Sequence, residues 1–254
     1  MHLTKFLLAI TISALVLTSC STDADDPISE LHEPHLLNLG ASSKDLLTDA
    51  NYKSLTIEIL SVEGFEPSSF AIKTFETFLK KHLDKPDGIF IERRTISSLD
   101  KKVLSIAELS GIERRKRTLY NTGDDLTVFI YFTNGTFHLD NENQKTLGSA
   151  YRNTSIAIYG NTLQSLAKRA DMPMIEVLEA TTMMHEFCHL LGLTNIHKDK
   201  DHMHEHPLAK GHCSVKGCLM ESNIYFGEGM DLMNLEVPQL DAKCIADLKA
   251  LAEK

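Results

Sequence analysis

Four segments of the chain have the apolar patterns that β-strands require. Residues 54–60 (SLTIEIL) alternate apolar and polar side chains, as a half-buried strand does. Residues 126–132 (LTVFIYF) are almost continuously β-branched or aromatic, which indicates a central strand buried on both faces. Two further strands are expected at residues 88–96 (GIFIERRTI) and 154–159 (TSIAIY).

Helical periodicity fills the intervals between these strands. After Pro67, apolar positions repeat with the helical period as far as His82, and residues 103–119 predict a second helix, interrupted near Gly111. The basic run at residues 114–117 lies in this second helix, where it is expected to form a solvated face. Strands that alternate with helices predict an α/β domain around a largely parallel sheet.

The first twenty residues form a separate segment. Lys5 precedes an apolar stretch at residues 6–17, which suits a signal-peptide core and is too short to span a bilayer. This stretch ends in LTSC at residues 17–20, which resembles the lipobox of bacterial lipoproteins. The resemblance implies that residues 1–19 are a signal peptide and that Cys20 becomes the lipidated first residue. The alternative is an ordinary secretory signal.

The lipobox resemblance also implies a location. A lipid at Cys20 would anchor an exported chain to a membrane, and Ser21 after the cysteine favours the outer membrane, facing the periplasm or the cell surface. Residues 20–50 lack periodicity and are expected to be a flexible tether. The domain itself is then expected at residues 51–254.

Composition limits the classes of function. The chain has 26 Lys and Arg against 35 Asp and Glu, a formal net charge of -9, so its surface repels the phosphates of nucleic acids. Its hydrophobic content of 43% is too high for a disordered chain and too low for a protein that spans the membrane several times. We expect a monomer that binds no nucleic acid.

A helix expected from residue 171 to Gly192 contains HEFCH at residues 185–189, the HExxH pattern. Residues four apart on a helix are neighbours, so His185 and His189 project from one face and can bind one metal ion. Glu186 lies about 60° beyond His189 around the helix axis, close enough to reach a metal-bound water but badly placed to be a ligand. The alternative is two core histidines held by hydrogen bonds. We interpret the motif as a zinc site.

The sequence that follows resembles the archaemetzincin family of the metzincin clan. That family has the signature HExxHxxGxxHC, four residues, C, one residue and M, with a later CxxC. His212-Cys213, Cys218 and Met220 match the spacing of its second part. The chain departs from the family in three ways. Asn195 occupies the simple third-histidine position, nineteen residues (193–211) stand where the family has two, and the last pair reads Cys244-Ile-Ala-Asp247.

The resemblance covers residues 185–247 and implies a fold and two metal sites. The fold is a metzincin-like catalytic domain with a mixed, largely parallel twisted sheet, an active-site helix and a small C-terminal subdomain that ends in a helix. The subdomains would be residues 51–192 and 193–254. The catalytic zinc would be held by His185, His189 and His212, with Glu186 as general base and Met220 as the Met-turn residue. A second, structural zinc would be held by Cys213, Cys218, Cys244 and Asp247.

Several alternatives remain open at this stage. Cys213 and Cys218 form either part of the second zinc site or a disulfide, which is natural outside the cytoplasm. The third ligand of the catalytic zinc is His212 or a histidine of the insertion, with His206 favoured among His197, His202, His204 and His206. An arrangement with Glu221 as the third ligand is another option, and Cys188 is expected to be a small buried residue.

These residues predict a zinc peptidase. A metal-bound water activated by Glu186 would hydrolyse the peptide bond of a peptide or protein substrate. The substrate is expected to pair with an edge strand, which element order places at residues 147–150. The rival prediction is a non-catalytic zinc-binding lipoprotein, a pseudoenzyme or a metal scavenger, although metal binding alone does not need Glu186.

Overall fold

The computed structural model describes residues 32–142, 144–169, 174–194, 204–222 and 236–253. At its centre is a five-stranded sheet with the strand order β2-β1-β4-β7-β6. The first four strands in this order are parallel to one another, and the edge strand β6 is antiparallel to β7. Their bounds are β1 (Ser54–Val62), β2 (Gly88–Ile96), β4 (Asp125–Thr133), β6 (Gly148–Arg152) and β7 (Ser155–Tyr159). This mixed, largely parallel sheet confirms the predicted α/β fold class.

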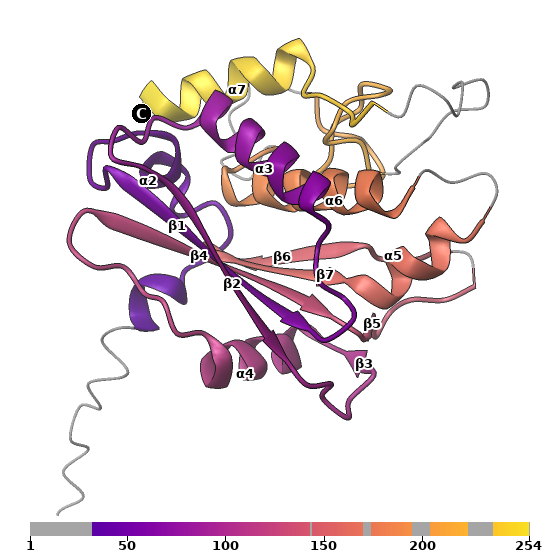
Figure 1. Ribbon diagram of the computed structural model, residues 1–254. Helices are drawn as coiled ribbons and strands as arrows, with labels where there is room; N and C mark the ends of the chain where they lie inside the picture. The colour runs from indigo at the N-terminus through magenta and orange to yellow at the C-terminus, as the bar shows by residue number, and fades with distance from the viewer. Residues whose placement is uncertain (1–31, 143, 170–173, 195–203, 223–235, 254) are drawn as a thin grey trace, which may run out of the picture.

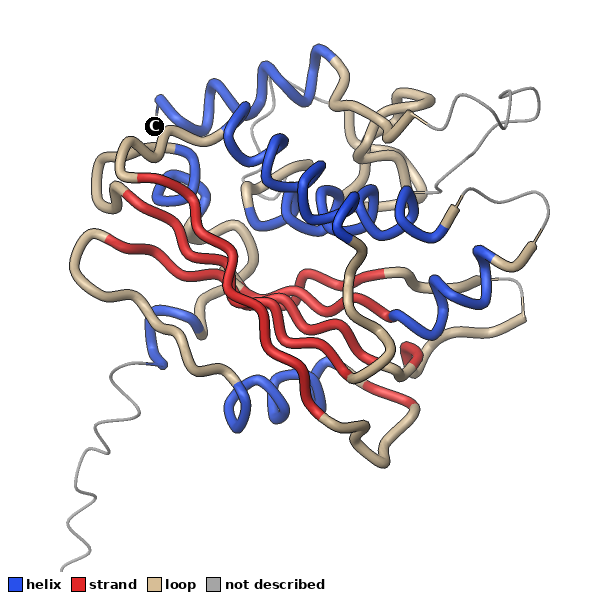
Figure 2. The backbone as a smooth tube through the Cα atoms, viewed as in Figure 1, coloured by secondary structure: helices blue, strands red, loops and turns tan. Residues whose placement is uncertain are grey.

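Helices cover both faces of the sheet (Figure 1). The helices α3 (Ser69–His82) and α6 (Ile175–Leu190) pack against each other on one face, and α7 (Ala242–Glu253) lies on the same side. The opposite face is covered by α4 (Ile106–Lys116), while α5 (Gly160–Ala167) directly follows β7. Figure 2 shows the strands as one twisted layer between these helices. The final helix α7 agrees with the expected helical end of the chain.

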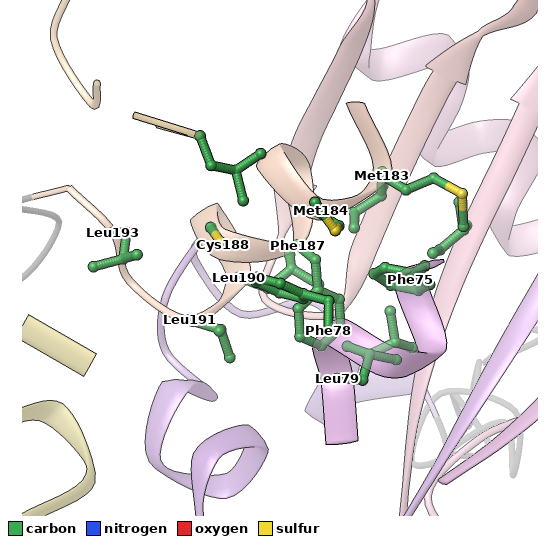
Figure 3. Close-up of a cluster of buried hydrophobic side chains, with 14 of the residues drawn as sticks. Phe75, Phe78, Leu79, Met183, Met184, Phe187, Cys188, Leu190, Leu191 and Leu193 are labelled. Atoms are coloured by element: carbon green, nitrogen blue, oxygen red, sulfur yellow. The ribbon is translucent and has the colours of Figure 1, made fainter. Parts of the chain in front are cut away.

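The core has two parts because the sheet is buried on both faces. The larger part lies between the sheet, α3 and α6, and the smaller part lies on the α4 side. In Figure 3, Phe75 and Phe78 of α3 lie close to Phe187 of α6. The rings of Phe75 and Phe187 meet edge to face, with centroids 5.5 Å apart. Such an edge-to-face contact stabilises the pair beyond the burial of its area, and so holds α6 against α3.

The second predicted helix is shorter than expected. Ser105 caps α4 reciprocally with Glu108, each side chain accepting from the other residue's backbone amide, so the helix begins at Ile106. The preceding β3 (Val103–Leu104) pairs in parallel with β5 (Thr136–Phe137) in a separate small sheet. After the helix, Arg117 turns inward and is only 5% exposed. The prediction of a solvated basic face is therefore wrong for Arg117, whose guanidinium is bonded to Glu113.

The prediction of a flexible tether at residues 20–50 is wrong for residues 32–50. The short helices η1 (Glu33–His35) and α2 (Ser43–Leu47) lie in this segment, and Leu46 and Leu47 belong to the larger core. Lys85 Nζ also donates to the carbonyl oxygens of Asp45 and Tyr52, at 2.6 and 2.7 Å. These contacts involve residues distant in the sequence, and no local period in the segment reveals them.

Several predictions concern residues outside the described ranges. They include the signal peptide at 1–19, Cys20, the start of the active-site helix at 171–173, and His197 and His202 of the insertion. Within the part of the chain that the structure describes, every helix falls short of the length or apolarity needed to cross a membrane.

Candidate metal centre

The helix α6 carries the HExxH residues into the interior. Its side chains from Val177 to Leu190 are all buried, and His185, Glu186 and His189 are among them. The helix ends at Leu190, and Gly192 adopts a φ of 91°, a left-handed conformation that glycine accommodates without strain. The amide of Thr194 then donates to the carbonyl oxygen of Gly211 at 3.3 Å. This bond joins the end of α6 to the residue before His212.

Three histidines meet at this point. The ring centroids of His185 and His189 are 4.9 Å apart, and each lies 5.2 Å from that of His212. One ligand atom from each ring lies within 4.8 Å of those of the other two. The structure thus brings together the three residues predicted as ligands of one ion, although His212 follows His189 by 23 positions in the sequence.

The hydrogen bonds of the three rings orient their other nitrogens. The Nδ1 atoms of His185, His189 and His212 lie 2.7, 2.9 and 3.0 Å from the carbonyl oxygens of Leu219, Leu193 and Lys210. A carbonyl oxygen only accepts, so each Nδ1 carries the proton and each Nε2 keeps its lone pair. Histidine ligands of metals are commonly held in this way.

The three imidazoles are neutral. Burial lowers the pKa of His185 to about 4, and burial also lowers the pKa of His189 and of His212. Three neutral imidazoles with free Nε2 atoms are the donor set of a catalytic zinc site, in which a fourth position stays open. The chemistry of these residues therefore fits zinc.

Glu186 lies beside the histidines and against the edge strand. Its side chain is buried, and burial raises the pKa of the carboxyl group to about 8, while the amide of Ala150 opposes the rise by donating to Oε2 at 2.7 Å. A Cβ atom at Gly148 would lie 2.5 Å from Cγ of Glu186. The strand therefore needs glycine at this position to let Glu186 approach.

These groups face a cavity of about 610 Å³. One side of the cavity is formed by His185, Glu186, His189 and His212, and another by residues 148–150 of β6. Since β6 is at the edge of the sheet, its outer side is not paired with another strand of that sheet. The structure confirms a strand at the edge, with bounds 148–152 in place of the expected 147–150. The cavity thus joins a candidate metal site, a carboxyl group and a strand edge.

Two other described candidates for the third ligand, His206 and Glu221, make different contacts, although Glu221 also lines the cavity. The ring Nδ1 of His206 accepts from the amides of Leu208 and Ala209, and the Glu221 carboxylate accepts from the amide of Gly217. Neither residue belongs to the three-histidine group within the described residues. Met220 is fully buried directly after Leu219, whose carbonyl oxygen holds His185.

A second group of ligand-type side chains lies between the insertion and α7. Ligand atoms of His204, Cys213, Asp241 and Cys244 lie within 4.8 Å of one another, and the Sγ atom of Cys218 is 3.7 Å from that of Cys244. The described cysteines, Cys188 included, are free and buried. The predicted residues Cys213, Cys218 and Cys244 are therefore brought together, and Cys213 and Cys218, the pair considered for a disulfide, are both free thiols in the structure.

Asp247 does not belong to this group of ligand atoms. Its Oδ2 atom instead lies 2.7 Å from Nε2 of His204. Sequence reasoning missed the role of His204, although this residue was one of four histidines considered in the insertion. The spacing of residues alone does not distinguish His204 from its neighbours, since only the folded chain brings it to Cys213.

Comparison with known proteins gives similarity of fold alone. No protein-family model matches the chain, and a search of curated proteins found no match. Among solved structures, archaemetzincin from Methanopyrus kandleri is similar, with a TM-score of 0.49, 14% identity, and coverage of 80% of this chain and 97% of that one. A zinc-dependent peptidase from Methanocorpusculum labreanum has a TM-score of 0.45 at 16% identity, covering 76% and 99% of the two chains. Metalloproteinase-II from Bacteroides fragilis has a TM-score of 0.43 at 12% identity, covering 82% and 56%.

Proposed function

We propose that this chain is a zinc-dependent peptidase. The observation that carries the proposal is the meeting of three neutral histidines, each with a free Nε2 atom, and a buried glutamate in one cavity. When bound, zinc supplies Lewis acidity that lowers the pKa of water toward ~7 and polarises a carbonyl group.

Glu186 performs the proton transfers in this proposal. Its carboxylate takes a proton from a water molecule in the cavity, and the water oxygen attacks the carbonyl carbon of the peptide bond. The carboxyl group then gives the proton to the leaving amine as the carbon–nitrogen bond breaks. The position of Glu186 suits this role, because its carboxyl group lines the same cavity as the three histidines.

The substrate is a peptide in an extended conformation. The outer side of β6 offers backbone groups to such a peptide, and main-chain pairing of this kind binds peptides in many other proteins. Ala150 of β6 donates to Glu186, so the strand that would hold the substrate also fixes the position of the proposed base.

Replacement of Glu186 tests the reaction directly. We expect Glu186→Gln to lower kcat on a fluorogenic peptide library by about 100-fold or more while zinc content stays unchanged, because the amide cannot accept the proton. Glu176→Gln, on the first turn of the same helix, is the matched control and should keep full activity. Zinc binding without hydrolysis of any peptide would instead favour the metal-scavenging function.

We also propose that the chain is a lipoprotein of the outer membrane, anchored through Cys20. Support comes from the apolar stretch at residues 6–17 and the LTSC sequence that follows it. Cells expressing the full chain should incorporate an alkyne-labelled fatty acid into the protein and retain it in the membrane fraction. Cys20→Ala should abolish the label. A label that persists in this variant would contradict the assignment of the anchor.

A further inference from the structure

The group of sulfur atoms beside α7 has the composition and spacing of a closed zinc site. Thiolates bound to a tetrahedral zinc at 2.3 Å lie about 3.8 Å apart. The sulfur atoms of Cys218 and Cys244 are 3.7 Å apart. Cys213 is fully buried, and its Sγ atom lies within 4.8 Å of that of Cys244. Three buried thiols, two from one loop and one from α7, therefore lie together.

His204 completes this group from the insertion. The side chain is 2% exposed, and its Nδ1 atom lies 3.2 Å from Sγ of Cys213. Its other nitrogen, Nε2, lies 2.7 Å from Oδ2 of Asp247. The ring thus stands between a thiol and a carboxylate. This is the arrangement in which a carboxylate holds one nitrogen of a histidine while the other nitrogen binds a metal.

We propose that Cys213, Cys218, Cys244 and His204 bind a second zinc ion, and that Asp247 positions His204 without binding the metal. The proposal is independent of the peptidase activity, since none of these five side chains lines the catalytic cavity. Three sulfur ligands and one nitrogen ligand are a common set for structural zinc.

Asp247 is connected to the sulfur group through the ring of His204. Residues three apart on a helix are neighbours, so Cys244 and Asp247 project from one face of α7. The imidazole of His204 is bonded to the Asp247 carboxylate and reaches Cys213 with its other nitrogen. The insertion thus supplies the fourth ligand, in place of the Asp247 that the family resemblance implies.

Asp241 has a different role in this arrangement. Its Oδ1 atom accepts from the amides of Lys243 and Cys244, at 2.6 and 3.3 Å, so the carboxylate caps the start of α7. Its other oxygen, Oδ2, accepts from the Cys213 thiol at 3.0 Å. The capping contacts account for an acidic residue at the edge of the site.

The second zinc would also stabilise the catalytic site. Residues 204–206 pair with the chain around His212, through bonds from the amide of Ser214 to the carbonyl oxygen of His204 and from the amide of His206 to that of His212. Cys213 directly follows His212. Zinc at the sulfur group would therefore tie the segment that carries His212 to α7.

Cobalt titration tests the ligand set, because thiolate ligands give Co²⁺ a strong charge-transfer absorption that histidine ligands do not. The protein is reduced, stripped of metal without oxygen, and titrated with Co²⁺. We expect the absorption of three thiolates per bound ion at the sulfur site. His204→Cys should raise this absorption by about one third, because a fourth thiolate joins the site. Asp247→Cys should not raise it.

Two further variants complete the test. Asp247→Asn should weaken metal binding at this site by about 10- to 100-fold while the absorption at saturation stays that of three thiolates. This substitution is mild, so it tests the proposal even if His204→Cys does not fold. His138→Cys places a new thiol at an exposed position and is the matched control, with unchanged absorption.

The opposite results would overturn the proposal. If Asp247→Cys raised the absorption and His204→Cys did not, Asp247 would be the ligand. If the reduced wild-type protein showed no thiolate absorption with Co²⁺, the cysteines would not form a metal site. Peptide hydrolysis is measured separately on the zinc-loaded protein, so failure of the catalytic proposal leaves this result unaffected.

Discussion

At the scale of single residues, the geometry of the proposed base depends on a residue without a side chain. Gly148 lies in β6 where a Cβ atom would be 2.5 Å from Cγ and 2.8 Å from Oε1 of Glu186. The three atoms nearest to such a Cβ all belong to the Glu186 side chain. A methyl group at position 148 must therefore displace the carboxyl group or the strand.

We predict that Gly148→Ala lowers kcat for peptide hydrolysis by about 100-fold, since a displacement near 1 Å of a catalytic group has an effect of this size. Zinc content should be unchanged, because the three histidines lie on other elements. Gly111→Ala, in α4 on the other face of the sheet, adds the same methyl group away from the cavity and is the control. Wild-type kcat in Gly148→Ala would show that Glu186 is not the base.

His35 makes the stability of the fold depend on pH. Its ring is buried, and its Nδ1 atom lies 2.8 Å from both Nη2 of Arg117 and Oγ1 of Thr154. Burial, followed by the charges of Arg117 and His32, lowers the pKa of His35 to about 3. In the unfolded chain the pKa is near the ordinary value of 6.5.

The sign of the effect follows from these two values. The unfolded chain binds a proton at position 35 below pH 6.5, whereas the folded chain does not until about pH 3, so stability falls as the pH falls through this window. Between pH 7 and pH 4.5 the loss due to His35 is about 2–3 kcal/mol.

Urea unfolding at the two pH values measures this loss. Asparagine does not titrate, so His35→Asn should lose about 2–3 kcal/mol less than the wild type between pH 7 and pH 4.5. The facing groups Arg117, His32 and Glu113 are the same in both proteins, and their contributions cancel in the difference. His138→Asn, at an exposed position, should behave as the wild type. Equal losses in all three proteins would contradict a buried neutral His35.

At the scale of elements, the sequence predicts the strands and helices that have a clear local pattern of apolar residues. The strands β1, β2, β4 and β7 lie within two residues of their expected bounds. The apolar runs of β1, β4 and β7 reflect their burial in the sheet, whereas β2 is a partly exposed edge strand. The HExxH residues were equally accessible to prediction, since a spacing of four on one helix places both histidines on one face.

Other elements depend on contacts between distant residues, which no local pattern reveals. The strands β3 and β5 have two residues each and exist only as partners of each other. His204 reaches Cys213 because residues 204–206 pair with residues 212–214 across the insertion. The pairing replaces Asp247 with His204 in the group of ligand atoms, and the spacing of Cys244 and Asp247 in the sequence gave no indication of it.

At the scale of the whole molecule, the segment before β1 is part of the folded domain. Asn153 Nδ2 donates to the carbonyl oxygen of Pro34 and to Oγ of Ser42, both at 2.8 Å. The helix α2 contacts α7, so the segment joins the two ends of the described chain. Residues 32–50 therefore connect the sheet with the helix that carries Cys244.

The stability of the protein distinguishes a packed segment from a tether. Leu46 is 0% exposed, and its replacement by alanine should lower the free energy of unfolding by about 2–5 kcal/mol, because the removed side chain leaves a cavity. In a tether the same change would have an effect within about 0.5 kcal/mol.

Leu37 gives the matched control in the same segment. Its side chain is 49% exposed, and its carbonyl oxygen accepts from the amide of Asn153, a contact that alanine keeps. Leu37→Ala should therefore change the free energy of unfolding by less than about 0.5 kcal/mol in the same urea titration. If Leu46→Ala had an equally small effect, residues 32–50 would not belong to the cooperative fold.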